Sequence, residues 1–343
     1  MQISKTVETK PAFPQAVVIG ASAGGLKALV ALIAQLGDDF PIPILMVQHI
    51  SVDATGSVLL EALQRNSKLV CRHGKNGETL KKGHVYLAPS GHHLMVDENA
   101  KILITKGAHE NRSRPAIDPL FRSAAVTFGN RLIAILLTGY LDDGTAGMEM
   151  IKRCGGACIV QDPEDADYPQ MPQHAIENVA VDYVVPVQEM GGLLYKLIGE
   201  KLPKSKPLPK EVLIEADIAK RVLSDLPSVN TLGRQVPFNC PGCGGNLWVM
   251  EKAATVRFRC HTGHAYTADI LLAEQTDKIE ETMWTALRMF EERKNLLTTM
   301  MEKQNGSIAK ISQERINQSQ VHIERIRQIL QAGDKGFQED MPV

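Results

Sequence analysis

Residues 20–24 read Gly-Ala-Ser-Ala-Gly and place a lone serine on a turn bracketed by glycines. The spacing G-x-S-x-G allows a sharp strand-to-helix turn that exposes the Ser22 hydroxyl as a nucleophile. Free N–H groups of the following helical turn would then face an oxyanion formed there. Two other interpretations fit the turn alone: Ser22 caps a helix, or the turn binds a dinucleotide, which would favour a glycine at position 22.

A serine hydroxyl needs a base to take its proton and a carboxylate to orient that base. His49 follows the second apolar run of the chain, and Asp142 and Asp143 follow a later one. The carboxyl ends of parallel strands share one edge of a sheet, so we expect these side chains to converge on Ser22. The pattern itself leaves both aspartates open, and Asp143 could instead cap the next helix.

Three of the six cysteines lie close together near residue 250. Cys240 and Cys243 form a C-x2-C knuckle, and after sixteen intervening residues Cys260 and His264 form a C-x3-H pair. Three thiolates and one imidazole complete a closed tetrahedral set, which predicts a structural Zn²⁺. His261 competes for the fourth position, but its adjacency to Cys260 would strain a shared metal. A reduced cluster without metal is the alternative, which a short segment with few large apolar residues disfavours.

Short apolar runs alternate with helical patterns from residue 16 to residue 199. The runs lie at 17–19, 44–47, 85–88, 132–137, 158–160 and 183–185. This alternation predicts an α/β fold with a doubly wound, mostly parallel, Rossmann-like sheet. Two further runs, 93–96 and 101–105, flank a polar turn and predict an antiparallel hairpin set into that frame.

Composition changes divide the chain. We expect a disordered N-terminus at 1–15, a catalytic domain at 16–199, a linker at 200–211, a zinc-ribbon-like module with a leading helix at 212–268 and a helical tail at 269–343. The linker contains three prolines and four lysines between Lys201 and Lys210. The tail has helical periodicity with a break at 305–307, which predicts a helical hairpin. Its apolar residues would pack on the module or on a second subunit, giving a homo-oligomer.

Charge and hydropathy exclude several classes of protein. The formal net charge of -1 argues against a general nucleic-acid-binding surface. No run of 18 apolar residues occurs, and the first 20 residues lack a signal-peptide pattern, so we expect a cytoplasmic protein without membrane insertion.

Several motifs occur in the order seen in one known family. They are 20–25 (GASAGG), 47–49 (VQH), 83–89 (GHVYLAP), 111–118 (NRSRPAID), 137–144 (LTGYLDDG) and 171–172 (MP). Over about residues 16–199 the chain therefore resembles the catalytic domain of the CheB-type protein-glutamate methylesterases. The resemblance implies demethylation of glutamyl methyl esters on chemoreceptors, with glutamine deamidation as a related activity and no cofactor for catalysis.

The resemblance also implies roles for individual residues. Ser22 matches the nucleophile, His49 the base and Asp143, directly before a glycine, the acidic member of the triad. Backbone N–H groups of Ala23 and Tyr140 match the oxyanion site. Two departures from the family bear on that site: Ala23 stands where many members carry threonine, and a Tyr-Leu pair at 140–141 replaces a Met-Gly pair.

The loop with Arg112 and Arg114 matches one near the family's cleft, where these arginines could meet an acidic receptor helix; solvated surface arginines are the alternative.

The family's usual receiver domain has no counterpart here, because about 15 residues precede the first strand. We therefore expect no regulation by phosphorylation in cis. The rival functions are a non-catalytic signalling scaffold and a nucleotide-binding oxidoreductase.

Overall fold

The computed structural model describes residues 15–50, 56–202, 205, 207–220, 226–250, 255–301 and 307–339. The chain forms two compact units, Met1–Ile270 and Leu271–Val343. The predicted disordered N-terminus lies outside the described residues except for Gln15, which is buried.

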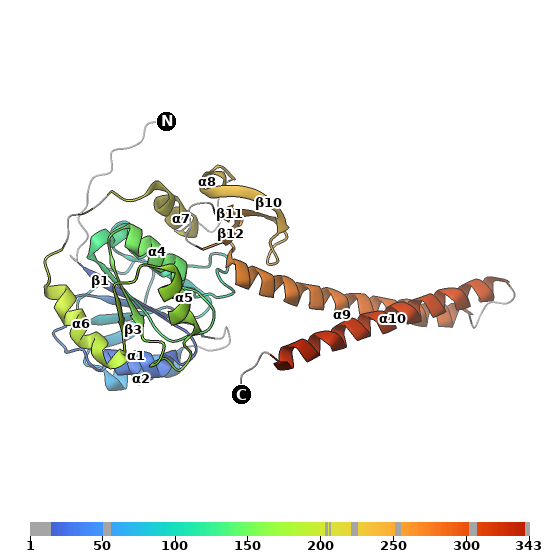
Figure 1. Ribbon diagram of the computed structural model, residues 1–343, viewed down its shortest axis with the longest axis horizontal. Helices are drawn as coiled ribbons and strands as arrows, with labels where there is room; N and C mark the ends of the chain where they lie inside the picture. The colour runs from blue at the N-terminus through green and yellow to red at the C-terminus, as the bar shows by residue number, and fades with distance from the viewer. Residues whose placement is uncertain are drawn as a thin grey trace. The chain divides into compact units, whose positions relative to one another are not determined.

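The first unit is built on a seven-stranded parallel sheet with the strand order β3-β4-β2-β1-β7-β8-β9 (Figure 1). The strands are β1 (Ala16–Ala21), β2 (Ile44–Gln48), β3 (Val70–His73), β4 (His84–Leu87), β7 (Leu132–Leu136), β8 (Ala157–Gln161) and β9 (Tyr183–Val185). The predicted α/β fold is confirmed. The sequence did not indicate β3, because this edge strand is short and only its Cys71 is buried.

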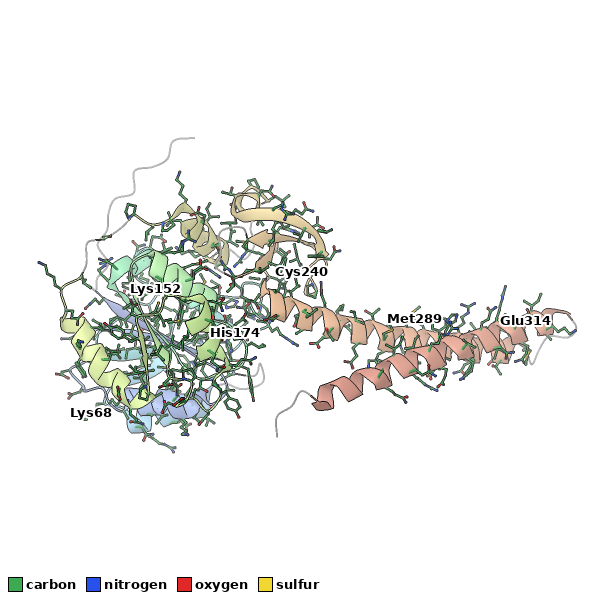
Figure 2. All side chains as sticks on the ribbon, in the orientation of Figure 1. Lys68, Lys152, His174, Cys240, Met289 and Glu314 are labelled. Carbon is green, nitrogen blue, oxygen red and sulfur yellow. The ribbon has the colours of Figure 1, made fainter. Side chains whose placement is uncertain are left out.

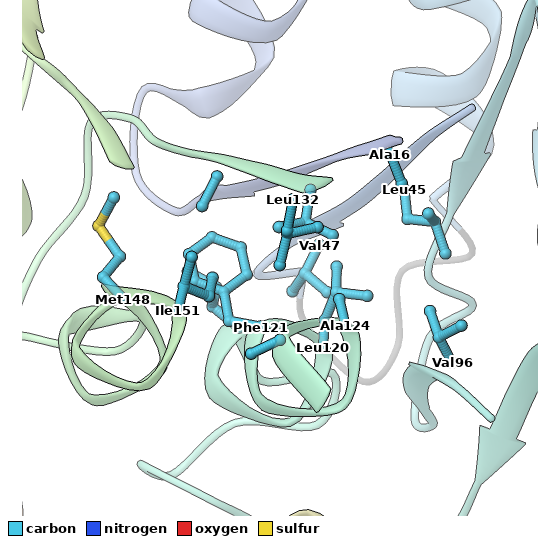
Figure 3. Packing of buried hydrophobic residues seen from close by; sticks show 14 of the residues in the cluster. Ala16, Leu45, Val47, Val96, Leu120, Phe121, Ala124, Leu132, Met148 and Ile151 are labelled. Carbon is cyan, nitrogen blue, oxygen red and sulfur yellow. The ribbon is translucent and has the colours of Figure 1, made fainter. Parts of the chain in front are cut away.

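Helices cover both faces of this sheet. One face carries α1 (Gly25–Ile33), α2 (Ser57–Asn66) and α6 (Val187–Gly199), and the other carries α3 (Ile117–Phe128), α4 (Thr145–Arg153) and α5 (Gln170–Asn178). In β1, Val17 packs in the apolar core under α1, α2 and α6, and Val18 packs in the core under α3, α4 and α5, because successive side chains point to opposite faces. Figure 3 shows Phe121 of α3 and Ile151 of α4 packed beneath the strands. A strand buried on both faces appears in sequence as a continuous apolar run.

The hairpin predicted within this frame is present. It pairs β5 (His93–Val96) with β6 (Ile102–Thr105) in antiparallel register. The Asp97 side chain accepts hydrogen bonds from the backbone N–H groups of Asn99 and Lys101 at 2.9 and 2.8 Å, which closes the turn.

The last part of the first unit is a small module. Helices α7 (Lys210–Lys220) and α8 (Leu226–Leu232) precede a four-stranded antiparallel sheet of β10 (Gly233–Asn239), β11 (Asn246–Met250), β12 (Arg257–Cys260) and β13 (Ala265–Thr267). Its apolar core comprises Ile218, Val229, Leu232, Trp248 and Met250. So small a core explains why the sequence indicated the leading helix and the cysteine cluster more clearly than the sheet.

The second unit consists of most of α9 (Ala268–Met301) and of α10 (Ser307–Glu339). Leu287 of α9 packs against Ile323 and Ile326 of α10, and Arg327 pairs with Glu291 at 2.6 Å. Lys294 of α9 also donates to Gln320 of α10 at 3.1 Å, so residues later in α9 meet residues earlier in α10 and the two helices are antiparallel. The predicted break at 305–307 falls largely outside the described part of the chain. Among the described residues, no helix combines the length and the apolarity needed to cross a bilayer.

Candidate active site

Three adjacent strands carry polar side chains at their carboxyl ends. Ser22 follows β1, His49 follows β2, and Asp143 follows β7, and β2, β1 and β7 are neighbours in the sheet. Because parallel strands end at the same edge, the three side chains meet although they are far apart in sequence.

The three side chains form a continuous chain of hydrogen bonds. Nδ1 of His49 lies 3.0 Å from Oγ of Ser22, and Nε2 lies 2.8 Å from Oδ2 of Asp143. Since a carboxylate only accepts, Nε2 carries the proton and Nδ1 is left as the acceptor for the serine hydroxyl. In serine proteases of the Ser-His-Asp type the two ring nitrogens have the opposite assignment.

Asp143 is buried and receives four hydrogen bonds. Its Oδ2 accepts from His49 and from the Ile117 N–H at 2.7 Å, while Oδ1 accepts from Asn111 Nδ2 at 3.0 Å and from the Asp118 N–H at 3.3 Å. Burial alone would raise the pKa of this carboxyl, but these hydrogen bonds, and the charge that His49 carries when protonated, hold the pKa of Asp143 below its usual range. The group is therefore a fixed anion that can orient an imidazole.

Asp142 has a different environment from its neighbour. Its Oδ1 is buried and finds no hydrogen-bond partner among the described residues, and burial raises the pKa of Asp142 to about 6. The Asp142 carbonyl accepts from the Thr145 N–H at 3.1 Å, at the start of α4. Of the two aspartates that the sequence pattern left open, the structure places Asp143 against His49.

Tight backbone packing fixes the serine turn. The Ser22 N–H donates to Thr138 O at 3.0 Å, and Gly24 closes the turn with a left-handed φ of 75°. Gln48 Nε2 donates to both Ser22 O at 2.7 Å and His49 O at 2.9 Å. The Gln48 amide thus ties the Ser22 turn to the end of β2, a contact that the sequence did not predict.

The close approach of Gly139 to this turn yields a prediction. A Cβ at position 139 would lie 2.7 Å from both Ser22 Cβ and Met171 Cε, which real Cβ atoms do not tolerate. We expect Gly139→Ala to displace Ser22 and to lower kcat for any reaction at the Ser22 hydroxyl by about 10²-fold, the scale expected of a displacement of about 1 Å. Gly192→Ala on α6 is the matched control, because nothing lies within 4 Å of that Cβ. Equal kcat values for both variants would contradict the prediction.

The surroundings of Ser22 include an open cleft and nearby backbone amides. The cleft has a volume of about 700 Å³ and is lined by Leu26, Val30, Ala31 and Ala62 among others. Within the described residues, the N–H groups of Ala23 and Tyr140 have no acceptor, whereas the Leu141 N–H donates to Gln170 at 3.0 Å. The Tyr140 ring is exposed and lies 4.7 Å from that of Tyr168, measured between ring centroids.

The two arginines of the 111–118 motif have different surroundings. Arg112 is exposed and has a left-handed φ of 64°. Arg114 is half-buried, and its Nη1 donates to Gly107 O at 2.9 Å, so its guanidinium is anchored to the main chain.

The cysteine cluster lies in the module, where Figure 2 labels Cys240. The sulfurs of Cys240, Cys243 and Cys260 and a ring nitrogen of His264 all lie within 4.8 Å of one another, so the four residues could hold a metal ion. The ring of the competing His261 lies instead near Trp248, with ring centroids 6.5 Å apart.

A buried ion-pair network joins this module to the parallel sheet's helices. Glu110 accepts from Arg122 of α3 at 2.7 Å and from Arg259 of β12 at 3.2 Å. Burial would raise the pKa of Glu110, yet the two guanidinium groups lower it to about 2. On the same strand, Arg257 makes a two-pronged contact with Glu215 of α7, at 3.2 Å for each nitrogen. Such pairs fix geometry, because removing one partner leaves a buried charge uncompensated.

Two further residues behind the carboxylate were not assigned roles in the sequence analysis, although both fall within the 111–118 motif. Asn111 donates to Asp118 as well as to Asp143, at 3.0 Å in each case. Asp118 also accepts from the Gly147 N–H at 2.7 Å, while burial and the neighbouring Asp143 charge raise the pKa of Asp118 to about 7. Side-chain amides and acids at the start of a helix are too common for their types alone to reveal these contacts.

These features define a Rossmann-like α/β protein with a serine-hydrolase arrangement of side chains at its sheet edge. The family model described as CheB methylesterase matches residues 17–194. The chain belongs to the CheB methylesterase family.

Relatives agree with that assignment. A Leptospira interrogans protein, provisionally named a protein-glutamate methylesterase/protein-glutamine glutaminase, is 37% identical over 183 residues, which cover 53% of this chain and 94% of that protein. A Clostridium acetobutylicum protein with the same activities in its name is 38% identical, and the match spans 54% of this chain and 53% of that relative. The crystal structure of the Thermotoga maritima CheB methylesterase catalytic domain is similar with a TM-score of 0.51 and 35% identity, covering 53% of this chain and 98% of that one.

Proposed function

We propose that this chain is a cytoplasmic serine hydrolase that demethylates glutamyl methyl esters on chemoreceptor-type signalling proteins. The observation that supports this most strongly is the continuous hydrogen-bonded chain from Ser22 Oγ through His49 to Asp143, with separations of 3.0 and 2.8 Å. Family membership and the names of the relatives supply the substrate class.

In the proposed mechanism, Nδ1 of His49 takes the Ser22 proton as Oγ attacks the ester carbonyl. The protonated imidazole then gives that proton to the departing methoxide, which leaves as methanol. Water deprotonated by His49 next attacks the acyl-enzyme, releasing the glutamate carboxylate and restoring the Ser22 hydroxyl. Asp143 holds the ring through Nε2 in both steps and stabilises its cationic form.

The negative oxygen of each tetrahedral intermediate needs hydrogen-bond donors. The N–H groups of Ala23 and Tyr140 are the proposed donors, because they flank Ser22 and have no acceptor within the described part of the chain. Exposed Arg112 would meet an acidic receptor segment at the cleft, whereas Arg114 would shape the loop through its bond to Gly107 O.

Methanol release from a methylated chemoreceptor cytoplasmic fragment tests this function. The proposal expects multiple turnovers by the wild-type chain, and ammonia release from a fragment carrying receptor glutamines would extend it to deamidation. A non-catalytic scaffold would bind the fragment without releasing methanol, and that result would refute the enzymatic function.

We further propose that Cys240, Cys243, Cys260 and His264 bind a structural Zn²⁺. The Cys243 and Cys260 sulfurs are 3.7 Å apart, and Cys260 Sγ lies 3.5 Å from His264 Nδ1. Tetrahedral zinc with Zn–S bonds of about 2.3 Å would place neighbouring sulfurs about 3.8 Å apart, so this separation fits. No position is left for a substrate, so the ion would support the fold of a module with a small apolar core.

The zinc site makes a quantitative prediction. Protein purified under reducing conditions should contain about one zinc ion per chain, as expected for one four-ligand site. Cys243→Ser should lose most of this zinc, whereas Cys71→Ala, which removes a thiol outside the cluster, should retain it. Elemental analysis makes the measurement, and less than half-stoichiometric zinc in the wild type would contradict the assignment.

Self-association through the long helices stays a prediction. Several large apolar side chains of α9 are exposed, among them Ile279, Trp284, Met289 and Leu296. Light scattering of the full chain over a range of concentrations tests for it.

A further inference from the structure

Asn111 lies directly behind the carboxylate that orients His49. It is buried, and its two amide hydrogens are divided between Asp118 Oδ2 and Asp143 Oδ1, each at a heavy-atom distance of 3.0 Å. A primary amide has only two such hydrogens, so both are used to hold carboxylates. Asn111 thus holds Oδ1 of Asp143, whereas His49 bonds Oδ2 of the same carboxylate.

The backbone of Asn111 needs support to present this amide. Its φ of 50° lies in the left-handed region, and that of Arg112 is 64°. Non-glycine residues hold this conformation only where their surroundings determine it. Here a tight turn supplies part of those surroundings: the Ser113 N–H donates to Glu110 O at 2.9 Å and the Glu110 N–H to Ser113 O at 3.3 Å, with Asn111 and Arg112 as the two central residues. The turn fixes the shape of residues 110–113, and contacts with other segments must fix where the turn lies.

The cysteine-containing module supplies contacts that hold this turn in place. The Asn111 N–H donates to Ala265 O on β13 at 3.0 Å, and Ala265 directly follows His264. The preceding residue, Glu110, is held by Arg259 of β12 as well as by Arg122. Arg259 is almost fully buried and also donates to Gly263 O at 3.1 Å, which ties this contact to the loop of the cluster.

We propose that Asn111 is a positioning residue for Asp143 and that the module, through Arg259 and Ala265, holds Asn111 in place. The inference builds on the proposed esterase function. Detaching Arg259 from Glu110 would loosen the attachment of the 110–113 turn to the module, so that the turn could shift and withdraw the Asn111 amide from Asp143. The module would then act on turnover without contributing any group that touches the substrate.

Asn111→Gly is the first test, because glycine adopts a φ of 50° freely and the variant therefore removes only the amide. We expect kcat for methanol release to fall about 10- to 100-fold, the range found for losing the outer partner of a metal-ligating histidine or carboxylate, which Asn111 resembles in its position behind Asp143. KM should stay near the wild-type value, because Asn111 does not face the cleft. Asn99→Gly, in the exposed β5–β6 turn, is the matched control and should leave kcat unchanged.

A substrate-free measurement separates this inference from the proposed function. The proton shared between His49 Nε2 and Asp143 should give a downfield NMR signal in the wild type. We expect that signal to broaden or move upfield in Asn111→Gly and to be unaffected in Asn99→Gly. A wild type that shows the signal but releases no methanol would refute the esterase function while still allowing this test of Asn111.

Arg259→Met tests the contribution of the module. In the wild-type background, Arg259→Met should lower kcat and change the His49 signal. In the Asn111→Gly background, the same substitution should lower kcat by less than a further twofold, because both changes act through the contact of the Asn111 amide with Asp143. Arg234→Met on exposed β10 is the control. The inference is overturned if Asn111→Gly leaves kcat within twofold of wild type with an unchanged signal. It is likewise overturned if Arg259→Met lowers kcat by the same factor in both backgrounds.

Discussion

Replacing Ser22 by alanine should lower kcat for methanol release by about 10⁴- to 10⁶-fold, and His49→Ala should have an effect of the same order. The reason is that, in the proposed mechanism, Oγ of Ser22 forms the covalent bond and His49, 3.0 Å away, takes its proton. Neither group works without the other, so the double variant should be no slower than the more impaired single variant. Initial rates of methanol production measure all three.

A control serine makes this result specific. Ser67 lies between α2 and β3, at the opposite edge of the parallel sheet from the carboxyl ends of the strands. Ser67 is half-buried and its Oγ accepts from the Leu69 N–H at 2.9 Å, so Ser67→Ala removes a local contact far from Ser22 and should keep kcat within about twofold. If Ser22→Ala retained a tenth of the wild-type rate, Ser22 would not be the nucleophile.

Asp143→Asn should be the next most damaging substitution, with kcat reduced about 10⁴-fold. Four donors converge on the Asp143 carboxylate, whereas an asparagine offers one oxygen and an NH₂ group. If that NH₂ group faces His49, Nε2 must become an acceptor and the ring proton moves to Nδ1. The imidazole can then no longer take the proton of Ser22, although every side chain keeps its place.

The adjacent aspartate is the matched control for this variant. Asp142→Asn changes the same group at the next position, but within the described residues it is Asp143, not Asp142, that bonds His49. Burial raises the pKa of Asp142 to about 6, so its charge is less favoured than that of Asp143 and its loss should cost little. We expect kcat within about threefold of wild type, the small effect typical of changes outside the reacting groups. Similar losses in both variants would show that the two aspartates had been assigned incorrectly.

Much of the candidate site could be predicted from the sequence because it depends on the topology of the sheet. Ser22 and His49 each follow an apolar run, and parallel strands end at one edge, so their convergence follows from the order of the elements. The choice between Asp142 and Asp143 required more than the pattern. In the structure, the Ile117 N–H and the Asn111 amide donate hydrogen bonds to the Asp143 carboxylate. Both donors come from a distant part of the chain, so the local pattern around the two aspartates could not reveal them.

Other features depend on contacts that local sequence does not encode. Which ring nitrogen of His49 faces Ser22 depends on how the segment after β2, which carries His49, lies against the segment after β7, which carries Asp143. Arg259 of the module and Glu110 are separated by 149 positions in the sequence, and only the folded chain brings the two side chains together. A buried pair of this kind has no signal in composition or periodicity.

The central claim is that Ser22 forms an ester with a receptor glutamate. Acid quenching of the wild-type chain during turnover of a methylated receptor fragment, followed by peptide mass spectrometry, tests it directly. The mechanism predicts a receptor glutamate linked through its side-chain carbonyl to Oγ of Ser22, and no such adduct in Ser22→Ala. An adduct on another residue, or methanol release that continues unchanged in Ser22→Ala, would contradict it.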